Sequence, residues 1–61
     1  MDKEEKSKAL IIAEELVKLS EQSVESCKNN PHLFDDEQLK LEQEILKIAN
    51  KMLENIKKIG N

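Results

Sequence analysis

Cysteine, histidine, proline and glycine each occur once in this chain, and tryptophan, tyrosine and arginine are absent. A single cysteine excludes an internal disulfide, and one cysteine with one histidine is too few for the usual structural zinc site. We also find no glycine-rich phosphate loop and no nucleophile–base pair. The sequence therefore predicts no catalytic residue, no metal and no cofactor.

The short length limits how much core the chain can build. Sixty-one residues allow one domain at most, and a core of this size rarely supplies more than about 3–5 kcal/mol. Without a disulfide or a metal, a partner chain is the remaining source of stability. Charged residues make up 38% of the chain and the net charge is −3, which argues against general binding to nucleic acid or anionic lipid.

The first residues and the single thiol bear on where the protein works. Residues 1–6 are too charged for a secretory signal, and no apolar run reaches the length of a membrane span. Cys27 has no partner with which to form an internal disulfide. We read it as a buried, inert thiol and expect a reducing, cytoplasmic location.

Only one stretch of the sequence, residues 29–34, interrupts a helical pattern. Pro31 cannot continue a helix, and the asparagines before it tolerate the left-handed conformation that ends one. Asp35, followed three residues later by Gln38, resembles a capping box, and Gly60 supplies a stop. The sequence therefore predicts an all-α fold, a single antiparallel helical hairpin over residues 1–61. Its parts are helix 1 at about 3–28, a loop at 29–34 and helix 2 at about 36–59.

Each predicted helix carries an apolar arc of roughly 180°, wider than the ~100° that packing on one core requires. The arc divides into two neighbouring seams on each helix. Those of helix 1 run through Ala9, Ile12, Leu16 and Leu19, and through Leu10, Ala13, Val17 and Val24. Those of helix 2 run through Leu41, Ile45, Ile48, Met52 and Ile59, and through Leu39, Leu46, Leu53 and Ile56.

A hairpin can hide only one seam of each helix, so the other pair needs a partner. We expect two hairpins to form a four-helix bundle, or one hairpin to dock on a helical protein. The predicted function is a non-enzymatic interaction or regulatory module. Its predicted interface residues are Leu10, Ile12, Leu16, Leu19, Leu41, Ile45, Ile48, Met52, Ile56 and Ile59.

Four polar residues fall within the apolar arcs near the loop end, namely Ser20, Ser23, Gln38 and Glu42. They could form a site in which Glu42 accepts a proton. A lone carboxylate without a second acid, base or metal is not a catalytic set. We therefore interpret the group as a polar layer that sets the register of the bundle.

Lysines form an outward stripe on helix 2, at Lys40, Lys47, Lys51 and Lys58. Phosphate contact with RNA is the functional alternative for this stripe. Glu44 lies four residues from Lys40, and Glu54 four from Lys58, so we expect ordinary helical ion pairs instead. On the polar side of helix 1, Ile11 is an isolated apolar residue and a further candidate contact point.

Two short stretches resemble known hairpin families. Met1-x-Lys3-x-Glu5-Lys6 and Asp36-Glu37-Gln38 look like Rop, the RNA-binding hairpin of plasmid copy-number control. The resemblance implies a dimeric four-helix bundle. The RNA-contacting positions would fall on unlike residues here, such as Ile11, Glu15 and Leu19, so the activity does not carry over.

The second stretch, residues 39–46, looks like the second helix of the small sporulation aspartyl-phosphate phosphatases. Their Ser-Gln-Glu-Leu-Asp motif would read Glu42-Gln43-Glu44-Ile45-Leu46, without its serine and aspartate. This resemblance implies a small regulator of a signalling phosphoprotein as another alternative function. Neither stretch identifies a family.

Overall fold

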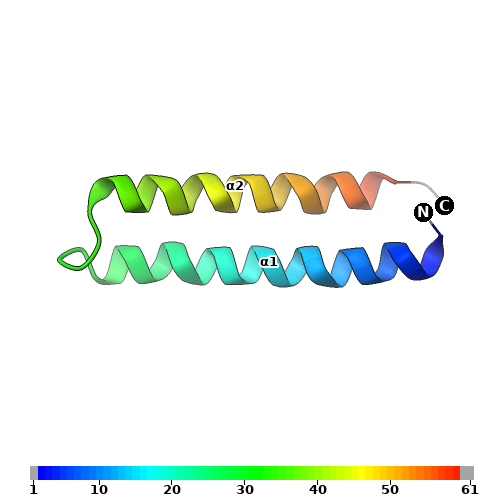
Figure 1. Ribbon diagram of the computed structural model, residues 1–61, viewed down its shortest axis with the longest axis horizontal. Helices are drawn as coiled ribbons and strands as arrows, with labels where there is room; N and C mark the ends of the chain where they lie inside the picture. Colours follow the sequence, from blue (N-terminus) through cyan, green and yellow to red (C-terminus); the bar gives the residue numbers. More distant parts are fainter. Residues whose placement is uncertain (1, 60–61) are drawn as a thin grey trace.

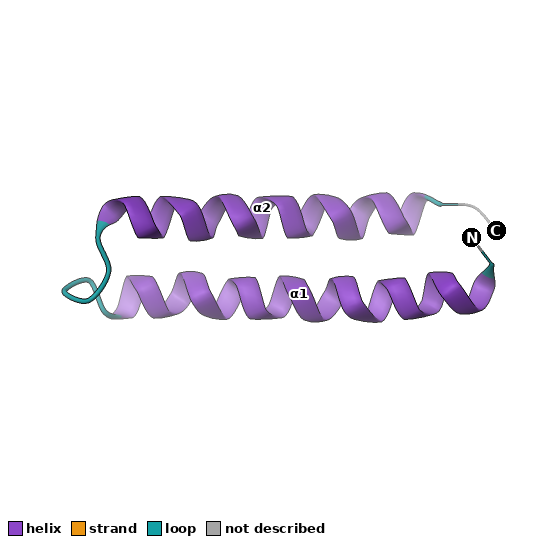
Figure 2. Cartoon of the chain, in the orientation of Figure 1, coloured by secondary structure: helices purple, strands orange, loops and turns teal. Residues whose placement is uncertain are grey.

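The computed structural model describes residues 2–59 and shows a two-helix antiparallel hairpin (Figure 1). Helix α1 spans Lys3–Asn29 and helix α2 spans Asp36–Lys58, each within one residue of the predicted bounds. The part of the chain described contains helix and loop but no strand (Figure 2). The Cα atoms extend over 46 × 14 × 9 Å, so the molecule is a single flat layer of two rods.

Aspartates cap both helices at their N-terminal ends. The Asp2 carboxylate accepts a hydrogen bond from the Glu5 amide at 2.8 Å, and the Asp35 carboxylate accepts one from the Gln38 amide at 2.9 Å. The predicted cap at Asp35 is confirmed. Only half of the expected capping box forms, because the Gln38 side chain turns to Glu42 instead of returning to the cap.

α1 ends without a residue in the left-handed conformation. Asn30 has φ −131° and ψ 61°, and no residue within 2–59 has a positive φ, so the left-handed conformation that asparagine tolerates is not used here. Instead, the backbone amide and the side-chain amide of Asn30 both donate to the Ser26 carbonyl, at 3.1 and 2.9 Å. The side-chain bond replaces the contact that a left-handed residue usually provides. The stop predicted at Gly60 lies outside the described residues.

The helices pack along one seven-residue repeat on each, which we call the hairpin seam. Its members alternate at spacings of three and four residues, as in a coiled coil, and all of them are buried or half-buried. They are Leu10, Ala13, Val17, Ser20, Val24 and Cys27 of α1, and Leu39, Glu42, Leu46, Ala49, Leu53 and Ile56 of α2. At the open end, Lys6 Nζ donates to the Ile59 carbonyl and fixes the register.

The core of this seam is thin. The buried apolar residues are small or medium-sized, namely Ala13, Val24, Cys27 and Ala49. In this antiparallel register, Ala13 lies opposite Leu53 and Ala49 lies opposite Val17. A small residue therefore faces a larger one at both levels. Within residues 2–59 no large side chain is fully buried. One hairpin therefore removes little apolar surface from water.

Neither helix, in the range 2–59, combines the length and apolar character that crossing a lipid bilayer demands.

Candidate functional site

Seven large apolar side chains remain open to solvent along the middle of the hairpin, and we call them the apolar face. Their exposed fractions range from 38% for Leu16 to 68% for Ile12. They are Ile12, Leu16 and Leu19 of α1, and Leu41, Ile45, Ile48 and Met52 of α2. Each set repeats at spacings of three and four residues, so each helix carries a second coiled-coil seam beside the first.

Helix geometry puts both sets on the same side of the two-helix layer. Each member of the apolar face comes one residue before a hairpin-seam position, as Ile12 precedes Ala13 and Ile48 precedes Ala49. One residue is about 100° of rotation. Because the helices are antiparallel, the same backward step turns both sets toward the same side. The apolar face is therefore one continuous strip across α1 and α2.

The structure divides the ten residues predicted for the partner interface into two groups. Seven of them make up the apolar face. The other three, Leu10, Ile56 and Ile59, are half-buried. Leu10 and Ile56 belong to the hairpin seam, and the Ile59 carbonyl accepts from Lys6. Those three are therefore engaged within the hairpin.

The four residues of the predicted polar layer do not all meet. Gln38 Nε2 donates to Glu42 Oε1 at 3.0 Å, and Glu42 and Ser23 line one shallow hollow together with Phe34. Ser20 is buried and only 5% exposed, and it does not line this hollow. The heptad register sets Ser20 against Leu46, near the middle of the seam. The polar group at the loop end is therefore Ser23, Gln38 and Glu42.

Cys27 is buried at the same end of the seam, beside this group. Burial, and after it the negative charge of Glu42, raises the pKa of the Cys27 thiol above its ordinary value of 9.0. Because the thiolate is the reactive form, a raised pKa makes the thiol a poor nucleophile near neutral pH. This arrangement agrees with the predicted inert, buried cysteine.

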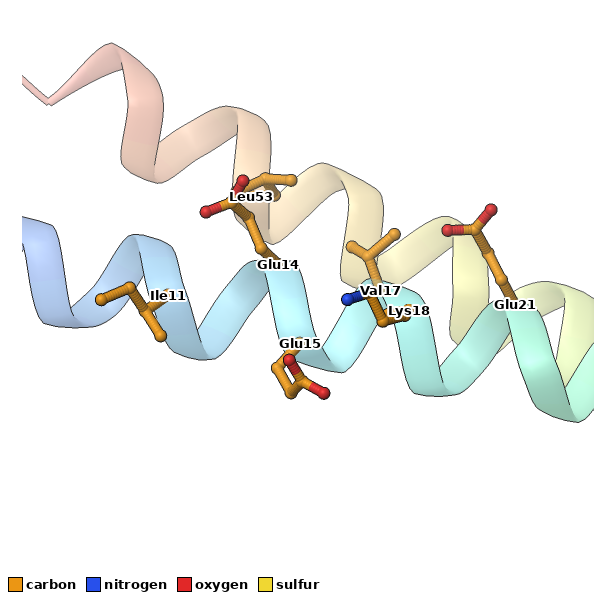
Figure 3. A pocket seen from close by; sticks show the side chains of 7 residues that line it. All are labelled: Ile11, Glu14, Glu15, Val17, Lys18, Glu21 and Leu53. Atoms are coloured by element: carbon orange, nitrogen blue, oxygen red, sulfur yellow. The ribbon is translucent and has the colours of Figure 1, made fainter.

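The opposite side of the layer, which we call the polar face, has a different character. A shallow hollow there is lined by acidic residues and a lysine around Ile11, Val17 and Leu53 (Figure 3). In Figure 3, Glu14 and Glu21 extend from α1 on the side of α2, whereas Glu15 extends away from it. Ile11 is 66% exposed, and it is not part of a row of exposed apolar side chains on this side. The two sides of the hairpin are thus chemically distinct.

The lysine stripe of α2 is exposed, but the ion pairs predicted for it are not formed. Over the described range 2–59, the one ion pair joins Lys8 Nζ to Glu4 Oε1 at 3.7 Å, in α1. Lys40 and Lys58 therefore extend into solvent without Glu44 and Glu54. The glutamates do lie one helical turn from the lysines. The free energy gained from an exposed ion pair is too small, however, to hold two long side chains in one conformation.

The outer edge of the apolar face on α2 was not recognised from the sequence. It consists of Glu37, Glu44, Lys51 and Lys58, all exposed. Their helical position lies next to Leu41 and Ile48, on the side away from α1. The available signal was their uniform seven-residue spacing. Grouping Lys51 and Lys58 with Lys40 and Lys47 as a lysine stripe separated them from the two glutamates.

These surfaces are suited to association. In the part of the chain that the structure describes, no cluster of three or more histidine, cysteine or acidic side chains could hold a metal ion. The polar group at the loop end contains a single carboxylate, that of Glu42. The largest organised feature is the apolar face. Comparison of the chain with protein-family models, curated proteins and solved structures found no match.

Proposed function

We propose that this chain is a non-enzymatic interaction module that pairs with a second copy of itself through the apolar face, giving a four-helix bundle. One observation carries the proposal. Seven large apolar side chains, 38–68% exposed, line one side of a hairpin in which no large side chain of residues 2–59 is fully buried.

The energetic balance favours a partner. Full burial of a large apolar side chain contributes about 1.5–3 kcal/mol. Covering even part of the apolar face on two hairpins would exceed the few kcal/mol expected of a lone domain of this size. Contiguous apolar surface of this kind marks interaction sites in soluble proteins. Association would therefore supply much of the stability of the fold.

A second copy fits this surface well. The apolar face spans both helices, so it needs another two-helix layer of similar width. A copy of this hairpin is such a layer, and two-fold pairing makes the same surface serve on both sides. The coiled-coil spacing on α1 and α2 suits knobs-into-holes packing between the layers. The free Cys27 thiol is compatible with work in the cytoplasm.

Sedimentation velocity over a wide dilution series tests the proposal. We expect a dimer at about 100 µM, dissociation on dilution, and a melting temperature that falls with protein concentration. Ile48→Gln should shift the equilibrium toward monomer, because it puts an amide in the middle of the apolar face. A chain that stays monomeric at about 100 µM and melts at one temperature throughout would contradict the proposal.

A further inference from the structure

The outer edge of α2 carries its charges in an order that reverses about its middle. Reading along the helix at seven-residue steps, Glu37 and Glu44 are acidic and Lys51 and Lys58 are basic. All are exposed, and none is engaged in an ion pair within residues 2–59. Turned end for end, this edge presents a lysine wherever the original presents a glutamate. It is complementary to an antiparallel copy of itself.

The α2 part of the apolar face is symmetric about nearly the same point. End-for-end reversal near Lys47 exchanges Ile45 with Ile48 and Leu41 with Met52. One turn further out it exchanges Gln38 with Asn55, two amides. Apolar residues thus meet apolar residues, and polar residues meet polar ones. The apolar exchanges centre between Leu46 and Lys47, and the charge exchanges centre between Lys47 and Ile48, so the two centres lie within one residue of each other.

We propose, building on the self-association above, that the two copies pair with α2 antiparallel to α2 about a two-fold axis near Lys47. The loops then lie at opposite ends of the bundle. Glu44 lies beside Lys51 of the partner subunit, and Glu37 beside Lys58 of the partner subunit. By symmetry each pair occurs twice. These flanking positions are the ones that set orientation in antiparallel coiled coils.

The other two-fold arrangement, with both loops at one end, is less complementary. It sets α1 of one copy along α2 of the other. Glu15 would then lie beside Lys51 of the partner subunit, but Lys8 would lie beside Lys58 of the partner subunit. One attraction and one repulsion largely cancel. The opposite-end arrangement has attractive pairs only.

Charge exchange distinguishes the two arrangements. Lys51→Glu should raise the dimer Kd roughly tenfold, because two attractive pairs become repulsive. Adding Glu44→Lys to it should restore the Kd to within about threefold of the original. The matched control is Lys47→Glu, which makes the same change in net charge on the polar side of the same helix and should have little effect. A double variant as weak as the single one, or a control as weak as Lys51→Glu, would overturn the arrangement.

A distance measurement provides the second test. A spin label on Lys8→Cys, in a Cys27→Ser background, should give an intermolecular distance of more than about 30 Å, estimated from the rise per residue. A distance under about 30 Å in a protein shown to be dimeric would overturn the arrangement but leave the self-association intact. A chain that is monomeric at every concentration would instead refute the self-association itself.

Discussion

Gln38 Nε2 donates to Glu42 Oε1 at 3.0 Å, one turn apart on α2. Glu42 occupies a hairpin-seam position between Leu39 and Leu46, where it is half-buried. The hydrogen bond gives its carboxylate one protein partner and draws the Gln38 side chain away from the cap of α2. A seam that is otherwise apolar on α2 is thus interrupted at one position by a charged residue.

Replacing this residue should stabilise the fold. Glu42→Leu extends the apolar seam and removes the desolvation of a carboxylate, so we expect a gain of about 1 kcal/mol in the free energy of unfolding. Urea unfolding at a fixed protein concentration measures it. Gln43→Leu, on the exposed polar side, is the matched control and should change the stability by less than about 0.5 kcal/mol. A loss of stability in Glu42→Leu would mean that the bond to Gln38 holds the end of the hairpin together.

Alkaline pH should destabilise the hairpin through Cys27. Burial, with Glu42 adding to it, raises the pKa of this thiol above 9.0 in the folded chain. The unfolded chain therefore releases the proton first, and its ionisation favours unfolding. The contribution to stability is fully present below about pH 8 and is lost as pH rises through 9.0 toward the folded pKa.

The comparison that isolates this effect is the change in stability between about pH 7.5 and pH 10 in the original chain and in Cys27→Ala. Ionisation of other groups in this range is common to both proteins and cancels in the comparison. We expect the original chain to lose more stability than the variant over the same interval. Equal losses would show that Cys27 ionises as easily in the folded chain as in the unfolded one.

The cap of α2 should contribute measurably to stability. Asp35→Ala leaves the Gln38 amide without its acceptor and should cost about 1 kcal/mol. Asp35→Asn keeps an acceptor oxygen in the same place, so it should retain most of that energy. Thermal unfolding of the three proteins at equal concentration compares them. If the asparagine variant were as unstable as the alanine variant, charge at the helix end would matter more than the hydrogen bond.

The helices, their bounds and their two seams could be predicted from the sequence because each depends on local information. Pro31 breaks the helical pattern, Asp35 caps the second helix, and a seven-residue spacing shows in the one-dimensional order. The end of α1 was predicted less well. Asn30 could satisfy the Ser26 carbonyl either through a left-handed backbone or through its side chain, and composition does not distinguish the two.

The polar layer shows a second limit. The helical pattern predicts Ser20 beside Gln38 and Glu42, whereas Ser20 is buried near the middle of the seam. A helical wheel shows which face of its helix a residue occupies, but not which residue of the other helix lies opposite it. That pairing depends on the register between the helices, which the Lys6–Ile59 contact and the loop set together. A three-dimensional structure was needed for that assignment.

Ile11 and Ile12 provide the most direct test of which side of the hairpin associates. They are adjacent, of the same type and almost equally exposed, at 66% and 68%. Ile12 belongs to the apolar face, whereas Ile11 lines the hollow on the polar face as well as the outer side of α1. Replacing either one with glutamine changes the overall hydrophobicity of the chain equally. A difference between the two variants can therefore come only from position.

We expect Ile12→Gln to raise the dimer Kd at least roughly tenfold, because the substitution is made twice in the buried layer. Ile11→Gln should leave the Kd within about threefold of the original. Sedimentation velocity over a dilution series measures both, and circular dichroism checks that each variant keeps its helices. If the two variants weakened association equally, the apolar face would not be the specific interface. The attraction between copies would then depend on total apolar surface, and the distinction between the two sides of the hairpin would lose its functional meaning.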